Sequence, residues 1–480
     1  MHLGLTVIED AERDLIIDSA LTILQRVGMR MKGPVVMGLM EDAGANVDRD
    51  TGVVRMSEDL VRAALDALPE RLFIAGATPE RDLVLDRRSG PFFNPAGYMA
   101  KTLDYHTDTV RPSNLRDLRD GSLVMDATPE IDLMWTFATA NDVPAEQRQL
   151  REYHTYLTNT SKPLVLVDRP TDFAAMKRIM DVLGGGLEGF RERPRLALLC
   201  AARAPLGVNG ALIDATCEFA RLGAPIWAFT MPMAGATSPV TLAGTLAIMW
   251  AEMLGLVTVV QTASPGAGIV ACCGPGILDM KTASMSLGSV ENTLLGAASA
   301  RIGHHLGLPV HNSALASDAK HPGVQAGYEK GLKALTAGLA GADLLGGGFG
   351  ALESSSLFHL PMVPIDAEIA AMVRRLTGQT RIDEESIMLE AIERVGVGGS
   401  YLKERITRDR VRAGEHFYPS IGSRLSYDQW IAEGQTEPGA ARERIEEILA
   451  AHAACPDTAA TSKLSHDQLA ALAEICGVDG

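Results

Sequence analysis

Eight short apolar runs recur through the middle of the chain, and segments of helical periodicity separate them. At intervals of 29 to 44 residues, these runs begin near Phe92, Asp132, Pro163, Arg195, Ala224, Gly268, Leu308 and Ala342. Apolar strands that alternate with helices indicate a parallel sheet covered on both faces. Eight such units in about 260 residues fit a closed (β/α)8 barrel better than an open sheet. The sequence therefore predicts an α/β protein built on a TIM barrel, although residues 256–260 could also be counted as a strand.

The segments on either side of the predicted barrel have a mainly helical pattern. The first ninety residues show helical spacing of apolar side chains and one small strand, which predicts a helical N-terminal cap over residues 1–90. The barrel itself is expected over residues 91–362. Residues 363–480 become charged and helical, which predicts a C-terminal helical extension packed on the barrel. We expect this extension to serve as an oligomer contact or a docking surface, and the protein to be a homo-oligomer.

The charge balance argues against a nucleic-acid partner. The chain has 44 basic and 60 acidic residues, for a net charge of −16, whereas nucleic-acid binding depends on neutralising phosphates. The acidic start has neither the basic residues nor the apolar core of a signal peptide, and we find no apolar run of membrane-spanning length. We therefore expect a cytoplasmic protein that does not bind membranes.

Polar side chains gather where the predicted strands end, which is where a barrel keeps its chemistry. The richest stretch is residues 308–353, in which an apolar strand ends in His311 and Asn312. A loop with Asp318, Lys320 and His321 follows, then a helix whose start carries Tyr328 and Glu329, and a last strand that runs into Gly346, Gly347 and Gly348. This stretch is one βαβ unit.

Aromatic residues also fall at the strand ends, although aromatics make up only 5% of the chain. Aromatic faces hold a quaternary ammonium by cation–π contact, because such a cation has no N–H to donate. The candidates for a box around such a group are Tyr98, Trp135, Phe137, Phe229 and Phe349. Alternatively, each of these rings fills the barrel core.

The segment ASDAKHPGVQAGYEK, together with LAGAD and LES after it and PVTLAGTLA and GSVE before it, resembles the trimethylamine methyltransferase (MttB) superfamily. The resemblance spans most of the chain and implies a TIM barrel that passes a methyl group from a methylated amine to the cobalt of a corrinoid protein. Trimethylamine members contain pyrrolysine, but this chain uses only the standard residues, with 314–317 in the corresponding region. It therefore resembles the non-pyrrolysine branch, whose members demethylate quaternary amines such as glycine betaine.

The resemblance implies a small quaternary amine as substrate and a separate corrinoid-binding protein, carrying cob(I)alamin, as partner. No general acid is needed, since the amine leaves as a neutral tertiary amine, and the protein has to aim one methyl group and exclude water. We take His311, Asp318 and Glu329 as candidate catalytic residues. Asn312, Lys320 and His321 are candidate substrate ligands, and Arg169 or the N–H groups of 346–348 are further partners for a carboxylate. Gly346, Gly347, Gly348 and Tyr328 are candidate contacts to the cofactor.

Each of these roles has a structural alternative. Acidic residues such as Asp318 and Glu329 also suit loop tethers and the first turn of a helix, and glycine runs also serve tight turns. Three other functions stay open. Tetrahydrofolate could accept the methyl group directly, and a non-catalytic betaine-binding protein could share this architecture. A zinc-dependent thiol methyltransferase could use Cys272 or Cys273 with Cys200 or His311. In the leading hypothesis, a corrinoid-dependent methyltransferase, we expect this chain to bind no metal ion directly.

Overall fold

The computed structural model describes residues 4–87, 89–166, 173–454 and 461–478. Eight parallel strands form its central sheet, in the order β6-β19-β18-β15-β13-β11-β10-β9. They are β6 (Phe92–Phe93), β9 (Met134–Trp135), β10 (Leu164–Leu166), β11 (Leu196–Ala201), β13 (Ile226–Thr230), β15 (Ile269–Cys273), β18 (Val310–Ser313) and β19 (Leu344–Gly346). Each strand falls within one of the eight predicted apolar runs.

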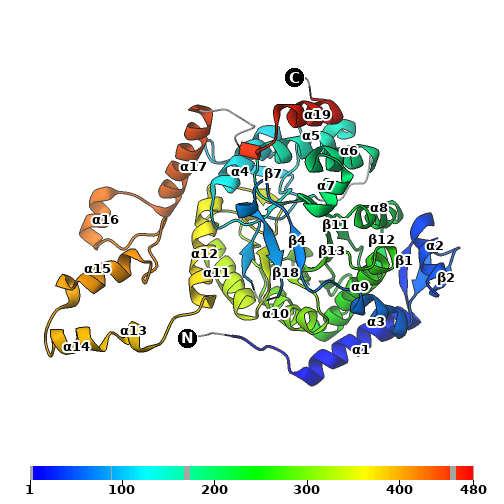
Figure 1. The fold of residues 1–480 in the computed structure, drawn as a ribbon, viewed down its shortest axis with the longest axis horizontal. Helices are drawn as coiled ribbons and strands as arrows, with labels where there is room; N and C mark the ends of the chain where they lie inside the picture. Colours follow the sequence, from blue (N-terminus) through cyan, green and yellow to red (C-terminus); the bar gives the residue numbers. More distant parts are fainter. Residues whose placement is uncertain (1–3, 88, 167–172, 455–460, 479–480) are drawn as a thin grey trace.

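Backbone hydrogen bonds join the first and last strands and close the sheet. The N–H of Asp132 donates to the carbonyl of Phe93 at 2.8 Å, and the N–H of Met99 donates to the carbonyl of Phe137 at 2.9 Å. Helices surround the sheet (Figure 1). They are α4 (Leu115–Ala127), α5 (Ala145–Thr158), α6 (Phe173–Gly184) with the short α7 (Leu187–Glu192), α8 (Gly210–Arg221), α9 (Leu242–Ala263), α10 (Val290–His305), α11 (Val324–Leu339) and α12 (Met362–Thr377). The prediction of a TIM barrel is confirmed.

Helices α9 and α12 bear on two boundaries in the sequence prediction, the extent of the sixth strand and the end of the barrel. Residues 256–260, which could be counted as a strand, lie inside α9. This helix is long and apolar enough to cross a membrane, but 78% of its most apolar window is buried inside the fold, as expected for a core helix. The last barrel helix, α12, runs from Met362 to Thr377. We therefore propose the same three-part division with the barrel extended to the end of α12.

The N-terminal segment contains more β-structure than the single small strand expected. Between its helices α1 (Asp10–Arg26), α2 (Pro34–Asp42) and α3 (Glu58–Asp66) lie β1 (Met29–Met31), β2 (Asn46–Asp48) and β3 (Val53–Arg55). These strands form a sheet with β12 (Gly207–Val208), in the order β12-β1-β3-β2. Strands of three residues are too short for an alternating pattern to stand out in the sequence.

A hairpin fills the N-terminal end of the barrel. Its strands are β4 (Leu72–Ile74) and β5 (Leu83–Leu85), joined through the short helix η1 (Pro79–Arg81). Leu72, Ile74, Leu83 and Leu85 share one apolar cluster with Trp227 and other side chains of the barrel interior. The N–H groups of Ala75 and Ala77 donate to carbonyls just before β11 and β10, which places the hairpin at the strand starts.

The loops at the opposite end of the barrel carry two small sheets. One contains β7 (Lys101–Asp104), β8 (Thr109–Pro112), β20 (Ala351–Leu352) and β21 (Leu357–Phe358). The other contains β14 (Met233–Ala234), β16 (Gly276–Asp279) and β17 (Ser284–Ser286). Both therefore lie after the strand ends, where the loops form the functional face of a barrel.

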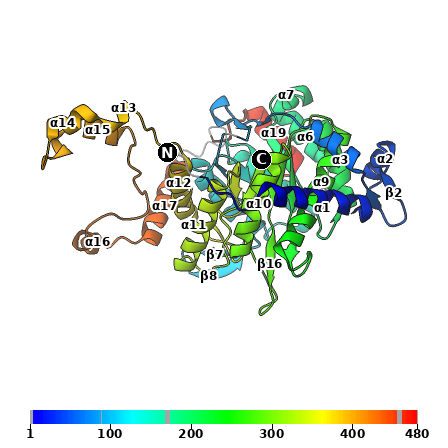
Figure 2. The same cartoon turned by 90° about the horizontal axis from the view of Figure 1, so that it is seen from below.

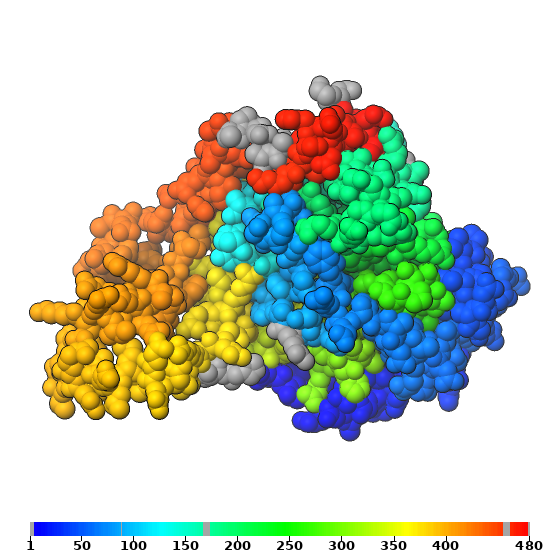
Figure 3. Space-filling view, in the orientation of Figure 1, coloured from blue at the N-terminus to red at the C-terminus, as the bar shows by residue number. Residues whose placement is uncertain are grey.

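The C-terminal segment packs on the barrel only in part. Helix α17 (Glu437–Ala454) packs on α4 and α12, and α19 (His466–Cys476) packs on α5 and α6. Residues 378–436, which we call the arm, connect α12 to α17 and contain α13 (Glu384–Ile387), α14 (Leu389–Val395), η2 (Tyr401–Lys403), α15 (Arg405–Arg412) and α16 (Tyr427–Glu433). Figures 1, 2 and 3 show the arm projecting away from the barrel.

Candidate functional site

A cavity of about 490 Å³ lies inside the barrel at the strand ends. Its wall is mostly apolar and includes Tyr98, Trp135, Phe229, Met231, Cys272 and His311. These side chains come from β9, β13, β15 and β18 and from the segments that follow β6 and β13. A mostly apolar cavity of this size with a few polar groups is typical of a small-molecule site.

Three of the five aromatic residues proposed for a cation box lie on this cavity: Tyr98, Trp135 and Phe229. Trp135 is only 3% exposed, and its ring stacks on His311 with 5.4 Å between centroids and 21° between planes. An indole held by stacking loses little freedom when a ligand arrives, which favours binding on its open side.

The other two aromatic residues proposed for the box lie outside the cavity. Phe137 is fully buried and packs against Tyr156 and Phe358, with centroid separations of 5.4 and 4.9 Å. Phe349 is fully buried edge-on to Phe93, at 6.4 Å. Strand β9 ends at Trp135, so the alternation of facing sides does not extend to Phe137. The structure thus assigns both rings to the core, which was the alternative stated for them.

A carboxylate that the sequence reasoning missed lies behind Tyr98. The Tyr98 hydroxyl donates to Glu152 Oε2 at 3.0 Å, and the N–H of Ala140 donates to Oε1 at 2.8 Å. Glu152 is 2% exposed and belongs to α5. Hydrogen bonding to an ionised carboxylate makes a phenol ring richer in electrons, so this arrangement suits a cation against the face of Tyr98. Nothing in the helical pattern of α5 distinguishes Glu152 as functional.

At the cavity wall, His311 joins Cys272 to Asn94. Cys272 Sγ lies 2.8 Å from His311 Nδ1, and His311 Nε2 lies 3.0 Å from Asn94 Oδ1. The amide nitrogen of Asn94 donates to the carbonyl of Pro95, so Oδ1 is left to accept. His311 therefore carries its proton on Nε2, and Nδ1 accepts from the thiol. Burial lowers the pKa of His311 to about 3 and raises that of Cys272 well above its ordinary value. Both groups are neutral, so a role for His311 as a base receives no support from its electrostatics.

Asn312 and Cys273 directly follow His311 and Cys272 in their strands. Because side chains alternate along a strand, both point to the opposite face of the sheet. Asn312 donates from Nδ2 to the carbonyl of Gly296 in α10 and borders a separate small cavity behind the strand. Cys273 donates to the carbonyl of Ala271, and burial raises its pKa to about 12. The structure thus places Asn312 away from the large cavity, contrary to the expectation for a substrate ligand.

Asp318 and Glu329 hold loops together beside the cavity. Ser286 and Ser354 donate to the Asp318 carboxylate, as do the N–H groups of Leu287 and Gly288. Burial raises the pKa of Asp318, but these hydrogen bonds outweigh it and keep the pKa below its ordinary value. Glu329 Oε2 accepts from Ser317 Oγ at 2.6 Å and from the Asp318 N–H at 2.8 Å. Neither carboxylate lines the cavity, which corresponds to the loop-tether alternative.

Three further candidates lie on the surface. Lys320 is exposed and its Nζ donates to the carbonyl of Asp318, while His321 is exposed and its Nδ1 lies 2.6 Å from the carbonyl of Pro322. Tyr328 is 60% exposed on α11. None of the three lines the cavity, and Arg169 lies outside the described residues.

Packing accounts for most of the glycine run. A Cβ on Gly346 would lie 2.2 Å from His311 Nε2, and one on Gly348 would lie 1.8 Å from the carbonyl oxygen of Leu315. Gly347 has a φ of +89° and is the member of the run that borders the cavity. The turn therefore requires glycine for close approach and backbone conformation. Gly346 and Gly348 are buried, so we assign them to packing rather than to a cofactor.

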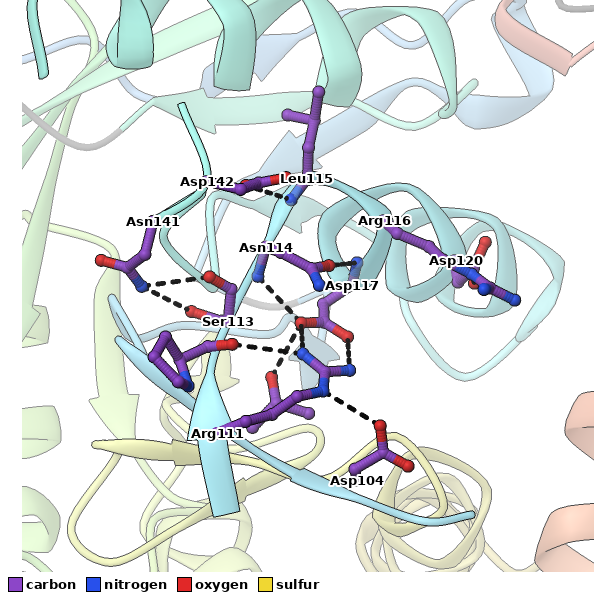
Figure 4. A network of polar contacts seen from close by, with 12 residues as sticks. Asp104, Arg111, Ser113, Asn114, Leu115, Arg116, Asp117, Asp120, Asn141 and Asp142 are labelled. Carbon is purple, nitrogen blue, oxygen red and sulfur yellow. Dashed lines mark hydrogen bonds and ion pairs between the residues drawn. The ribbon is translucent and has the colours of Figure 1, made fainter. Parts of the chain in front are cut away.

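A polar group lies at the other side of the cavity. Lys101 and Ser354, Ser355 and Ser356 border it. Lys101 Nζ pairs with Glu353 at 2.5 Å, and this hydrogen bond lowers the pKa of Glu353. The hairpin that carries Lys101 is fixed by Arg111, which donates two hydrogen bonds to Asp117 and one to Asp104 (Figure 4). The Lys101 ammonium group can bind a carboxylate, whereas the three serine hydroxyls donate to Asp318, to the carbonyl of Gly347 and to the carbonyl of Glu353.

Comparisons with known proteins agree with this architecture. The sequence pattern of trimethylamine methyltransferase (MTTB) matches residues 4–470. The chain is 30% identical to the trimethylamine methyltransferase MttB of Methanosarcina thermophila, over 91% of each chain. It is 26% identical to a glycine betaine methyltransferase of Desulfitobacterium hafniense, over 90% of each chain.

Solved structures support the same fold. The hydroxylamine complex of MtmB matches with a TM-score of 0.54 and 12% identity, over 92% of this chain and 88% of that one. At that identity the likeness is one of fold alone. The sequence match, which covers nearly the whole chain, carries the assignment, and it confirms the resemblance seen in the sequence. The chain belongs to the trimethylamine methyltransferase family and is a methyltransferase.

Proposed function

We propose that this methyltransferase removes a methyl group from a small quaternary amine, with glycine betaine or a close relative as substrate. The observation that carries the proposal is the wall formed by Tyr98, Trp135 and Phe229, with the Glu152 carboxylate behind Tyr98. A permanent cation gains from aromatic faces and from a nearby negative charge, and it needs no hydrogen-bond acceptor. The similarity to a glycine betaine methyltransferase supports the same substrate class.

The side of the cavity that carries Lys101 suits the carboxylate end of a betaine. Lys101, whose ammonium group also pairs with Glu353, can receive a carboxylate with its remaining N–H donors. A betaine carries its cation and carboxylate on one short molecule, so the two poles of the cavity together fix its direction. In this arrangement the aromatic wall holds the methyl-bearing nitrogen, and the loops that Asp318 tethers keep the serines in place.

We further propose that the methyl acceptor is a corrinoid carried by a separate protein, and that the reaction takes place in the cytoplasm. The cavity of about 490 Å³ has room for a betaine but not for a corrin ring as well, so the ring would remain at the opening. Gly347 and Ser355 border the cavity with little side-chain bulk. The acceptor, as cob(I)alamin, would supply the nucleophile. The chain's own residues bind the cation, orient one methyl group and exclude water.

No proton transfer is required of the protein. The C–N bond breaks with both electrons going to nitrogen, and the amine leaves neutral. Cys272 and His311 are neutral beside the substrate, so they contribute polarity and shape without a charge that would repel a cation.

The other functions considered from the sequence have less support. Within the described residues, no group of three or more His, Cys, Asp or Glu side chains could hold a metal ion, so Cys272 and His311 lack a third ligand for zinc. Among the cavity-lining residues that the structure describes, none specifically favours a folate. Membership of a methyltransferase family sets aside a non-catalytic betaine-binding role.

The test compares glycine betaine with 3,3-dimethylbutyrate, which has carbon in place of the cationic nitrogen and nearly the same shape. Calorimetry should detect betaine binding and at least tenfold weaker binding of the neutral analogue. A turnover assay should then detect loss of cob(I)alamin and formation of dimethylglycine. Equal binding of the two compounds would reject the cation site, and tight betaine binding without turnover would reject the acceptor.

A further inference from the structure

Asn94 carries a buried amide that does not line the cavity but contacts a residue that does. It directly follows β6 and is fully buried. Its backbone N–H donates to the carbonyl of Leu345 in β19 at 3.3 Å, and its Nδ2 donates to the carbonyl of Pro95 at 2.6 Å. Oδ1 is then left for His311, whose Nε2 lies 3.0 Å away. A buried amide, fixed by its own neighbours, thus holds one ring of the cavity wall.

The hydrogen bond between Asn94 and His311 crosses a strand. In the sheet, β19 lies between β6 and β18, and Gly346 of β19 occupies the place where a side chain would separate the two residues. A Cβ on Gly346 would lie 2.2 Å from His311 Nε2 and 2.7 Å from Asn94 Nδ2. The backbone of Gly346 is outside the left-handed region, so steric room rather than conformation accounts for glycine here. The missing side chain is what allows Asn94 and His311 to meet across β19.

Hydrogen bonds hold the His311 ring at both of its nitrogens. Nε2 donates to Asn94, and Nδ1 accepts from the thiol of Cys272, with 2.8 Å between Nδ1 and Sγ. Because hydrogen bonds depend on direction as well as distance, the two together leave the ring little freedom to tilt or turn. His311 is 3% exposed, and burial lowers its pKa to about 3, so the fixed ring is neutral.

The fixed imidazole backs the indole of Trp135. The two rings stack with 5.4 Å between centroids and 21° between planes, and both line the cavity. Because the imidazole is held in place, it sets the plane of the indole that packs on it. That plane decides what a ligand meets, since the face of an aromatic ring is negative and its edge is positive. A cation is therefore sensitive to the angle of the indole in a way that a neutral group of the same shape is not.

We propose that Asn94 is a positioning residue for substrate recognition: by fixing His311, it sets the face that Trp135 turns toward a quaternary ammonium. This role rests on the quaternary-amine substrate proposed above, and it assigns to Asn94 part of the preference for a cation over its neutral counterpart. Asn94 does not line the cavity, so its influence on the substrate passes through the two rings. Gly346 supports the same arrangement by leaving room for the hydrogen bond.

Calorimetry on Asn94→Leu tests the proposal. Leucine is similar in size to asparagine and removes the acceptor for His311 Nε2. The Kd for glycine betaine should rise about tenfold, as expected for loss of a well-oriented cation–π contact. The Kd for 3,3-dimethylbutyrate should change much less, because its uncharged tert-butyl group gains only contact area from the ring. Equal losses for the two ligands would mean that Asn94 serves the fold as a whole, and would overturn the proposal.

Asn312→Leu is the matched control. Asn312 is also a buried asparagine, it directly follows His311 in β18, and its side chain points away from the cavity toward Gly296 in α10. Its replacement should leave the Kd for glycine betaine at the wild-type value, and a selective loss of betaine affinity here would remove the special role of Asn94.

Gly346→Ala displaces the same pair by a second route. It adds a methyl group against His311 Nε2 without removing a hydrogen-bonding atom. It should also weaken betaine binding more than binding of the neutral analogue, and it replaces Asn94→Leu in the comparison if that variant does not fold. Betaine binding at wild-type strength in either folded variant would overturn the proposal.

A double variant separates this role from a direct one. If Asn94 acts only through the indole, Asn94→Leu added to Trp135→Ala should cause no further loss of betaine affinity, because the two changes are coupled. Additive losses would contradict the proposal. If Trp135→Ala alone leaves betaine binding unchanged, the cation site fails and the role of Asn94 fails with it. A loss in Trp135→Ala without a loss in Asn94→Leu would keep the cation site and reject only the role of Asn94.

Discussion

The hydroxyl of Tyr98 donates a 3.0 Å hydrogen bond to Glu152, a carboxylate 2% exposed in the wall of the barrel. Replacing Glu152 with Gln keeps the shape and the bond from the Ala140 N–H but removes the negative charge. We expect the Kd for glycine betaine to rise about tenfold, which corresponds to about 1.4 kcal/mol. Calorimetry with the neutral analogue 3,3-dimethylbutyrate is the control, and its affinity should not fall. Equal losses for both ligands would mean that Glu152 acts only through packing.

Trp135 should contribute to binding through its ring face. Trp135→Ala should raise KM for a quaternary amine by about thirtyfold, the equivalent of a desolvated cation–π contact of about 2 kcal/mol. Trp135→Phe should recover part of this affinity, because it restores an aromatic face. An unchanged KM in Trp135→Ala would remove the ring from the site.

Phe137 should affect stability rather than binding, since its ring is fully buried between Tyr156 and Phe358. Phe137→Ala should lower the free energy of unfolding by about 3–5 kcal/mol. Urea titration measures this loss, and KM measured well below the lowered Tm should match the wild-type value. A raised KM in the folded variant would return Phe137 to the site.

The buried His311 should make the protein sensitive to acid. Its pKa is lowered from 6.5 to about 3 in the folded protein, so the unfolded chain binds the proton more readily. Its contribution to stability is therefore fully present above pH 6.5 and is lost as the pH falls toward 3. Between pH 7 and pH 5 the loss amounts to about 2 kcal/mol. His311→Gln should show a smaller decrease in unfolding free energy over this interval, and parallel pH curves for the two proteins would contradict the shift.

Lys330 and Asp366 form a fully buried ion pair that supports the glycine turn. Lys330 Nζ contacts both Asp366 oxygens and the carbonyl of Gly348, and the N–H of Gly350 donates to Asp366. Lys330→Met should destabilise the fold by about 3–5 kcal/mol, because it leaves a buried charge unpaired. Adding Asp366→Leu should recover much of the loss in urea titrations. A double variant that is no more stable than Lys330→Met would indicate that the contacts to the turn outweigh the charge.

The barrel was predictable because most central strands, such as β10, β11 and β15, are buried on both faces and appear as uninterrupted apolar runs. The sequence prediction ended the barrel at residue 362, where α12 begins, because the helix itself carries charged residues such as Asp366 and Arg374 and so resembles the charged segment after it. Of the candidate site residues, Trp135 and His311 border the cavity, and both lie on regular strands, where alternation reports the direction of a side chain. Phe137 and Phe349 were misplaced because each follows the end of its strand, where alternation no longer reports direction. Glu152 was missed because its importance depends on Tyr98, 54 positions away in the sequence.

The β4–β5 hairpin blocks the N-terminal end of the barrel, which leaves the end that carries the strand-end loops as the route into the cavity. Its leucines fill the N-terminal end of the barrel. A small methyl donor therefore has to enter at the C-terminal end of the strands, which is also where an acceptor too large for the cavity has to bind. If the function proposed above holds, the methyl donor has to bind before the acceptor covers the opening, and the demethylated amine has to wait until the acceptor withdraws. For an acceptor of that size, the fold predicts ordered kinetics in which the donor binds first and the demethylated product is released last.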